Sequence, residues 1–258
     1  AVSFIRFGVD DILNTTELID SQGNINYNNI SLFSAADYAF NVAYARRLPI
    51  QGLDIGINSK IVHRKIGDFA SSWGFGLDAS LQFETSSAWK FGVMVRDITT
   101  TFNAWSIDEE EFNKIQNSIP GENQESPETL ELTKPKVQFG VAKSFKAFRD
   151  FNILTEIDMN MRFAETNDII STSFVSIDPA AGLQLDYLSM VYLRVGVNNF
   201  QYFTEFDGSK TTSLEPNFGV GFRYKGVQLD YALANIGAAS GTLYSNIFSV
   251  KVDIGYFR

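Results

Sequence analysis

The chain alternates between apolar and polar residues over long stretches. Between Trp73 and Phe83 every second residue is apolar, and the residues between them are small or polar. Successive side chains of a strand point to opposite faces, so this pattern predicts a strand with one apolar and one polar face. The sequence as a whole predicts an all-β chain, because the same alternation recurs in the segments 89–97, 151–163, 191–199, 217–224, 226–233 and 248–258.

The connections between the predicted strands indicate how the strands are arranged. We expect short turns and long loops to alternate without exception, the long ones being 10–35, 63–70, 99–134, 164–173, 200–214 and 236–245. Short turns on one rim, long loops on the other and an even number of strands are typical of a transmembrane antiparallel β-barrel of the bacterial outer membrane. In that layout the long loops are extracellular, and the short turns and the C-terminus are periplasmic. We place twelve strands, near residues 2–9, 36–46, 52–62, 71–83, 88–98, 135–145, 150–163, 174–187, 189–199, 215–225, 226–235 and 246–257.

A soluble β-sandwich also alternates and is the competing interpretation. Two features favour the barrel. The predicted strands run to about ten residues or more, against about five or six in soluble sheets. Their polar face also carries charges in mid-strand, which a barrel places in its lumen. Acidic and basic residues are nearly equal in number among these charges, and Lys60 joins the basic ones if it faces inward. Such a balance predicts that the charges pair with one another and fill the lumen, rather than forming a solvated wall. The lumen charges are Asp78, Lys90, Arg96, Glu156, Asp158, Arg162, Arg194, Arg223 and Asp230, with Asp54, Asp186, Lys251 and Asp253.

Composition excludes several classes of protein. No run of about 18 apolar residues exists, so no transmembrane helix is predicted. A net charge of -9 argues against a nucleic-acid partner, which requires clustered Lys and Arg. The absence of cysteine excludes disulfides and thiolate metal sites. The chain opens inside a predicted strand with neither Met nor a signal-peptide pattern, and we expect it to be mature, processed or incomplete at its N-terminus.

Few residues are suited to catalysis. His63 is the only histidine, and its position at a strand end beside Arg64 and Lys65 predicts a solvated surface histidine. With one histidine and no nucleophile motif we expect no enzyme, and we predict neither a cofactor nor a metal site. The glycines in 74–76 and 219–221 lack the helix start of a phosphate loop. We expect them to relieve crowding on the lumen face.

The segment 99–134 is the most distinctive part of what we predict to be a single barrel domain, residues 1–258. We expect a long acidic extracellular loop that contains a short helix, with Ser106 as N-cap and a stop at Pro120–Gly121. Its apolar face either packs on the barrel mouth or docks a partner. The acidic stretch that follows is predicted to be mobile. The apolar face of the helix consists of Phe112, Ile115 and Ile119.

Three segments resemble the PorV/PorQ family of outer-membrane proteins of the Bacteroidetes: 33–48, 56–83 and 89–105. The likeness is carried by Gly-x-Asn-x-Lys-Ile at 56–61, Gly-x-Gly-x-Asp at 74–78 and the Arg-Asp pair at 96–97. The family is similar in fold to FadL, a 14-stranded barrel that transports long-chain fatty acids. This chain lacks the family's N-terminal region with its Asn-Pro-Ala-type motif, since 178–180 lies too late. One missing N-terminal hairpin would account for twelve strands instead of fourteen.

The resemblance implies a role in type IX secretion, in which such barrels bind the translocon or carry secreted proteins. Partners would then be other outer-membrane or secreted proteins, in addition to the lipid bilayer and lipopolysaccharide. The alternative is a FadL-like channel for hydrophobic or small solutes. The partner-contact residues that we predict on the long-loop rim are Trp105, Phe112, Ile115 and Ile119.

Overall fold

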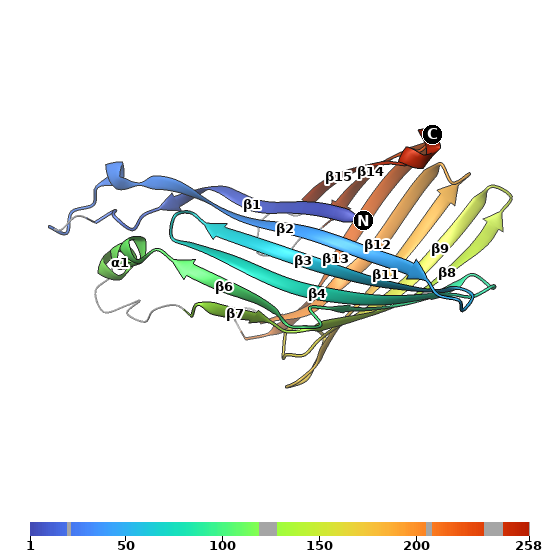
Figure 1. The fold of residues 1–258 in the computed structure, drawn as a ribbon, viewed down its shortest axis with the longest axis horizontal. Coiled ribbons are helices and arrows are strands. Elements are labelled where there is room, and N and C mark those ends of the chain that lie inside the picture. Colours follow the sequence, from blue (N-terminus) through green and yellow to red (C-terminus); the bar gives the residue numbers. More distant parts are fainter. Residues whose placement is uncertain (20–21, 119–127, 205–207, 235–244, 258) are drawn as a thin grey trace. The chain divides into compact units, whose positions relative to one another are not determined.

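The computed structural model describes residues 1–19, 22–118, 128–204, 208–234 and 245–257. It is a 15-stranded antiparallel sheet in which neighbouring strands follow the order of the chain (Figure 1). This confirms the predicted fold class, because an antiparallel meander is the strand order of outer-membrane barrels. Twelve strands form the main path: β1 (Val2–Asn14), β2 (Ser31–Arg47), β3 (Leu53–Ile66), β4 (Ala70–Glu84), β5 (Trp89–Arg96), β8 (Lys136–Phe148), β9 (Phe151–Arg162), β11 (Ser176–Tyr187), β12 (Val191–Thr204), β13 (Lys210–Tyr224), β14 (Val227–Ala234) and β15 (Ser245–Val252).

Three short strands and a helix lie off this path. β6 (Thr101–Ile107) pairs with β4 and with β7 (Leu130–Thr133), and β10 (Ile170–Ser171) pairs with β11. The helix α1 (Glu109–Ser118) follows β6 directly. Short 3-10 turns occupy Tyr27–Asn29 and Ile254–Phe257. Among the described residues, no helix is both long and apolar enough to cross a membrane.

The chain divides into two compact units, which we describe separately. Unit 1 comprises residues 1–45, 56–79 and 96–135, and so holds β1, most of β2 to β4, β6, α1 and β7. Unit 2 comprises residues 46–55, 80–95 and 136–258, and so holds β5, β8 to β15 and the remaining ends of β2 to β4.

Several predicted boundaries were wrong because strands continue beyond the obvious apolar alternation. β3 and β4 are separated only by residues 67–69, where Gly67 has a φ of +51° and its N–H donates to the carbonyl of Ser34. The predicted long loop 63–70 is therefore a tight turn. Likewise β12 and β13 extend until residues 205–209 separate them, so the predicted loop 200–214 is short. Long and short connections thus do not alternate throughout, and β15 ends at Val252 rather than at 257.

The segment 99–134 is more ordered than predicted where it is described, since β6 and β7 lie in it. The helix was predicted correctly, but its N-cap is Asp108 and not Ser106. The Asp108 carboxylate accepts from the N–H groups of Glu110 and Glu111, each at 3.0 Å, whereas Ser106 belongs to β6. The stop predicted at Pro120–Gly121 lies outside the described residues.

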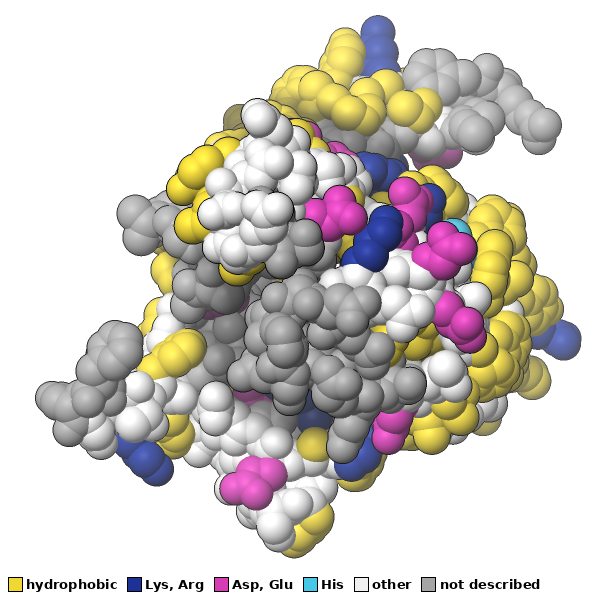
Figure 2. All heavy atoms as spheres, turned by 90° about the vertical axis from the view of Figure 1, so that its left-hand side faces the viewer, with side chains coloured by type: hydrophobic (Ala, Val, Ile, Leu, Met, Phe, Trp, Pro, Cys, Tyr) yellow, Lys and Arg dark blue, Asp and Glu magenta, His cyan; other side chains and the backbone are white. Residues whose placement is uncertain are grey.

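Burial is inverted relative to that of a soluble protein. Among the described residues only two apolar side chains are buried, Ala36 and Tyr192, against ten polar or charged ones. More than fifty large apolar side chains are exposed. Hydrophobic side chains accordingly gather on the surface, while acidic and basic ones cluster together (Figure 2). A soluble core requires the opposite arrangement.

The strand 73–83 shows the inversion residue by residue. Trp73 is 61% exposed and Phe75 38%, whereas Gly74, Gly76 and Asp78 between them are buried. The crowded face of β4 is therefore its polar face, as the alternation predicted. For every strand, the polar face is the one that carries the polar or small side chains, and the apolar face is the one that carries the apolar side chains.

Glycine permits close packing on the polar face of β4. A Cβ at Gly76 would overlap the Thr101 hydroxyl and lie 2.7 Å from Cε of Lys60, and one at Gly74 would overlap the side chain of Asn103. A Cβ at Gly92 of β5, in contrast, would meet nothing within 4 Å. The expectation that the glycines at 74–76 relieve crowding is confirmed.

We expect Gly76→Ala to lower the free energy of unfolding by about 1–3 kcal/mol, because the added methyl group overpacks this contact. The matched control, Gly92→Ala, should be neutral or stabilising by up to about 1 kcal/mol, since it only restricts the unfolded chain. Urea unfolding in detergent micelles measures both. Equal midpoints for the two variants would contradict the packing argument.

Candidate functional site

A cluster on the polar face of unit 1 brings one lysine to two carboxylates. Lys60 Nζ lies 2.9 Å from Oδ1 of Asp78 and 2.5 Å from Oδ1 of Asp97. All three side chains are largely buried, being 18%, 8% and 10% exposed. Asp78 also accepts from Nδ2 of Asn58 and from the N–H of Asp97, each at 2.9 Å. The cluster joins β3, β4 and the end of β5.

A backbone irregularity positions Asp97. Asp97 and Thr100 have φ values of +55° and +58°, and the hydroxyl of Thr101 donates to the Asp97 carboxylate. The chain therefore turns between β5 and β6 and places the carboxylate over β4. Sequence reasoning did not assign Asp97 to the lumen charges, because strict alternation from Arg96 puts it on the apolar face. It left open which way Lys60 points, and the structure places Lys60 on the polar face.

A second cluster in unit 1 anchors the β6–β7 hairpin. The guanidinium of Arg64 donates to Asp37 at 3.1 Å and to Glu131 at 2.9 Å, and its Cζ lies 5.3 Å from the ring centroid of Trp105. Trp105 Nε1 in turn donates to Glu131 at 3.1 Å. Trp105, which we predicted to contact a partner, is therefore engaged within the chain. Neither Arg64 nor Glu131 was predicted, since their contact depends on the register of β7.

The other predicted contact residues lie in or beyond α1. Phe112 is half-buried in the helix, and Ile115 belongs to the same helix. Ile119 lies outside the described residues. The structure thus confirms that Phe112 and Ile115 share a helix, and their role in binding stays a prediction.

In unit 2 Arg162 contacts two buried carboxylates. Its Nη1 lies 3.1 Å from Oδ2 of Asp168, whose side chain is fully buried, and its Nη2 lies 3.9 Å from Asp178. Asp178 Oδ1 is buried without a hydrogen-bond partner among the described residues. Asp168 belongs to the loop after β9, and its N–H is bound by the Thr166 hydroxyl. This contact ties the loop to the polar face, and sequence reasoning missed Asp168 because it lies outside any strand.

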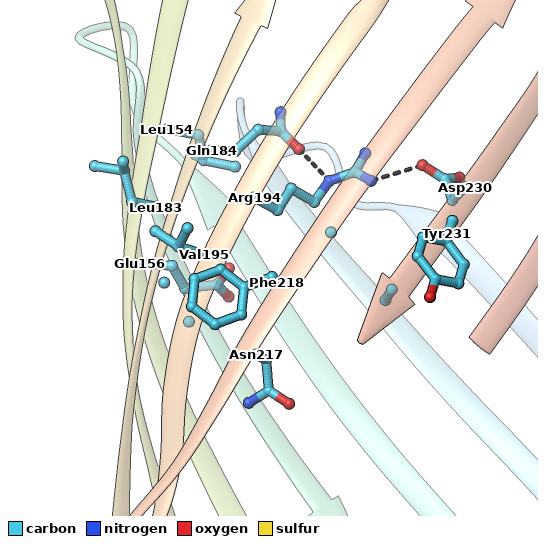
Figure 3. Close-up of a pocket in the computed structure, with 14 residues that line it drawn as sticks. Leu154, Glu156, Leu183, Gln184, Arg194, Val195, Asn217, Phe218, Asp230 and Tyr231 are labelled. Atoms are coloured by element: carbon cyan, nitrogen blue, oxygen red, sulfur yellow. Dashed lines mark hydrogen bonds and ion pairs between the residues drawn. The ribbon is translucent and has the colours of Figure 1, made fainter. Parts of the chain in front are cut away.

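Arg194 is held from both sides in the same unit. Its Nε donates to Gln184 Oε1 at 2.7 Å and its Nη1 to Asp230 Oδ1 at 2.6 Å, so the guanidinium bridges β11, β12 and β14 (Figure 3). Gln228 donates to the second oxygen of Asp230 at 2.8 Å. Of the predicted lumen charges, Asp78, Arg162, Arg194 and Asp230 are thus in ion pairs, as is Asp54, which lies 3.3 Å from Arg47.

Glu156 and Asp158 have no ion-pair partner among the described residues. Glu156 lines a hollow of about 400 Å³ beside Arg194 but lies apart from the bridged guanidinium (Figure 3). The floor of this hollow contains Gly182 and Gly196, which pair directly across β11 and β12. The polar face of unit 2 therefore combines fixed charges with an open acidic area.

Of the remaining predicted lumen charges, Asp186 is buried and Lys90, Arg96 and Arg223 are exposed. Lys90 lies 4.0 Å from Glu84, with both side chains at least half exposed. Arg96 and Arg223 are exposed and have no ion pair in the part of the chain that the structure describes. Whether all the predicted residues line one lumen stays a prediction.

The structure also bears on metal binding and on His63. The described residues contain no group of three or more His, Asp or Glu side chains that could hold a metal. His63 is not the solvated residue that we predicted. Its ring stacks on Trp73 with centroids 4.3 Å apart, and its Nδ1 lies 3.0 Å from the carbonyl of Ser72.

Comparison with known proteins gives no family. No family model matches the chain, and no curated protein is similar to it. The β domain of the Bordetella autotransporter BrkA, a solved structure, aligns over 96% of this chain and 95% of its own, with a TM-score of 0.40 and 10% identity. A likeness at this level carries no information on function. The resemblance to the PorV/PorQ family therefore rests on the sequence segments alone.

We expect Lys60→Met to destabilise the protein by about 3–5 kcal/mol, because it leaves two buried carboxylates without their cation. Adding Asp97→Asn should restore part of the loss, since one of the uncompensated charges is removed. Lys90→Met is the matched control, and its exposed, distant pair predicts a change of about 0–1 kcal/mol. Chemical unfolding in micelles measures the free energy of unfolding of all three variants. Equal decreases for Lys60→Met and Lys90→Met would show that the buried cluster stabilises the protein no more than an exposed ion pair does.

Proposed function

We propose that the protein is a β-barrel of the bacterial outer membrane that acts by binding other proteins. The observation that supports the membrane location is the inverted burial. More than fifty large apolar side chains are exposed, while the buried side chains are almost all polar. An apolar surface of this extent is stable in hydrocarbon and prone to aggregation in water. Antiparallel strands can cross a bilayer because they satisfy their backbone groups with neighbouring strands.

The length of the apolar faces fits this location. On β9 the apolar face extends over ten residue steps, from Phe151 to Met161. At a rise of about 3.3 Å per residue this is about 33 Å along the strand. A tilt of about 40° reduces it to about 25 Å, which is the height of the apolar band of outer-membrane barrels.

The segment 97–135 supports an interaction role. It leaves the main path of the sheet as β6, α1 and β7, with three glutamates in the first turn of the helix. Arg64 and Trp105 hold the base of this hairpin against β3. A surface on a hairpin whose base is already fixed loses less conformational entropy when it binds a partner. The resemblance in residues 33–105 narrows the partner class to the type IX secretion translocon or its secreted cargo.

A channel for small solutes is the second candidate. The observation that favours it is the hollow beside Arg194, which is lined both by polar side chains, among them the unpaired Glu156, and by apolar ones such as Leu183 and Phe218. Such a lining suits a small solute with both polar and apolar groups.

The membrane location predicts opposite results for two neighbouring positions of β15. Phe248 is 78% exposed on the apolar face, and Ser249 lies opposite Asp230 on the polar face. Phe248→Arg should cost about 2–4 kcal/mol of stability in bilayers if it lies near the midplane. Ser249→Arg should cost little, because its guanidinium faces Asp230. Folding titrations in phospholipid vesicles measure both, and equally small effects would contradict a lipid-facing Phe248.

The interaction role is tested by replacing residues 109–128 with a short Gly-Ser linker. The variant keeps Glu131 and Trp105, so the hairpin base and the heat-modifiable fold should survive. Pull-down from the native outer membrane, followed by mass spectrometry, should then lose the partner. Recovery of a large translocon barrel or of secreted proteins with a shared C-terminal sorting domain by the unaltered protein would support the secretion role.

Two point variants sharpen this test. Phe112→Ser removes an apolar side chain from α1, and Lys114→Gln, the matched control, removes an exposed charge from the same helix. Partner recovery should fall only for Phe112→Ser. Unchanged recovery with the linker variant would reject the segment as the docking site.

A further inference from the structure

Four aromatic rings form a row across four strands of unit 1. Phe4 of β1 stacks with Tyr38 of β2 at a centroid distance of 6.2 Å, and Tyr38 with His63 of β3 at 6.2 Å. His63 stacks with Trp73 of β4 at 4.3 Å. The row therefore crosses the strands at one level.

This row lies on the apolar face. Phe4 is 66% exposed and Trp73 61%. The residues next in sequence, Asp37, Arg64 and Ser72, belong to the polar face, where Asp37 and Arg64 form their ion pair and Ser72 is buried. Because a carbonyl oxygen can only accept, the contact with Ser72 O places a hydrogen on Nδ1 of His63.

Two basic side chains lie on the same face beside the row. Arg6 Cζ is 5.9 Å from the ring centroid of Tyr38, and Lys65 is two residues beyond His63 on β3. Each has one acidic neighbour, Asp10 at 3.7 Å from Arg6 and Asp68 at 3.5 Å from Lys65. All four side chains are about half exposed or more, and such pairs are weak and screened. Both cations therefore remain available to a stronger anion.

The row also marks a change in the character of the apolar face. On one side of it along the strands the side chains are mostly apolar and exposed, with Ser59 as an exception. They include Phe40, Val42, Ile57, Ile61 and Phe75. Tyr and Trp concentrate where hydrocarbon gives way to headgroups, and basic side chains there meet lipid phosphates.

We propose that this aromatic–basic surface, consisting of Phe4, Arg6, Tyr38, His63, Lys65 and Trp73, binds the phosphate headgroup of an anionic membrane lipid. Arg6 and Lys65 bind the phosphate, and the rings contact the glycerol and the upper part of the acyl chains. The site rests on the proposed membrane location. The lipid site goes beyond that location, because a merely apolar surface would not distinguish anionic from neutral lipids.

Trp73 is a built-in reporter for the site. The chain has three tryptophans, so Trp89→Phe with Trp105→Phe leaves Trp73 alone. This variant is reconstituted in mixtures of phosphatidylglycerol and phosphatidylcholine, with either lipid carrying brominated acyl chains. Quenching of Trp73 gives the ratio of the two lipids' binding constants at this surface. We expect a preference for phosphatidylglycerol that falls about fivefold on Arg6→Gln or Lys65→Gln, and approaches unity in the double variant.

Lys114→Gln is the matched control, because Lys114, like Lys65, is an exposed lysine with an acidic partner three residues away. It should leave the ratio unchanged. A binding-constant ratio near one for the unaltered surface, or a ratio that neither substitution changes, would overturn the lipid site. Strong quenching by either lipid would in that case still place Trp73 in the bilayer. No quenching by either brominated lipid would overturn the membrane location itself.

Discussion

The contact of Lys60 with Asp78 and Asp97 is the interaction on which the polar face of unit 1 depends. The carboxylates of Asp78 in β4 and Asp97 in the turn after β5 meet where both are buried, and the single ammonium group between them compensates one of their two negative charges. β4 can approach β6 this closely because Gly74 and Gly76 carry no side chains. The buried side of the sheet is thus held together by charge and hydrogen bonds, whereas most large side chains on the apolar side are exposed and make only cross-strand contacts such as the ring stacks.

Much of the fold could be predicted from the sequence, since a period of two is visible wherever one face is apolar. The strand 73–83 is the clearest case. Strand ends were harder to predict, because the alternation is lost there while backbone pairing continues. Residues 63–65 are basic or polar on both faces, and residues 200–204 carry aromatic side chains on both faces. Prediction there requires the register of the neighbouring strand. The helix in 109–118 was recognisable from its acidic first turn, yet Asp108 caps it, one of several nearby side chains able to do so.

The site was less predictable than the fold for a related reason. Alternation identifies which charges of a unit share a face, and it correctly placed Arg194 with Asp230 in unit 2 and Asp78 on the polar face of unit 1. It cannot find Asp97, because the backbone leaves regular extended geometry at that residue and turns the side chain over. Nor can it find Asp168 or Glu131, which reach the polar face from segments outside the main strands. Ion pairs of this kind depend on which segments lie opposite one another in the folded chain, and the local sequence does not encode this.

The ion pair between Arg64 and Glu131 spans 67 residues of sequence. Closing so long a loop is entropically costly, and chains dominated by distant contacts fold slowly. β3 is synthesised well before β7, so Arg64 can meet Asp37 of β2 early, but its pair with Glu131 cannot form until the intervening strands have emerged. During that interval the apolar faces are exposed to water and to one another. A nascent chain of this design is prone to aggregate until its strands have paired.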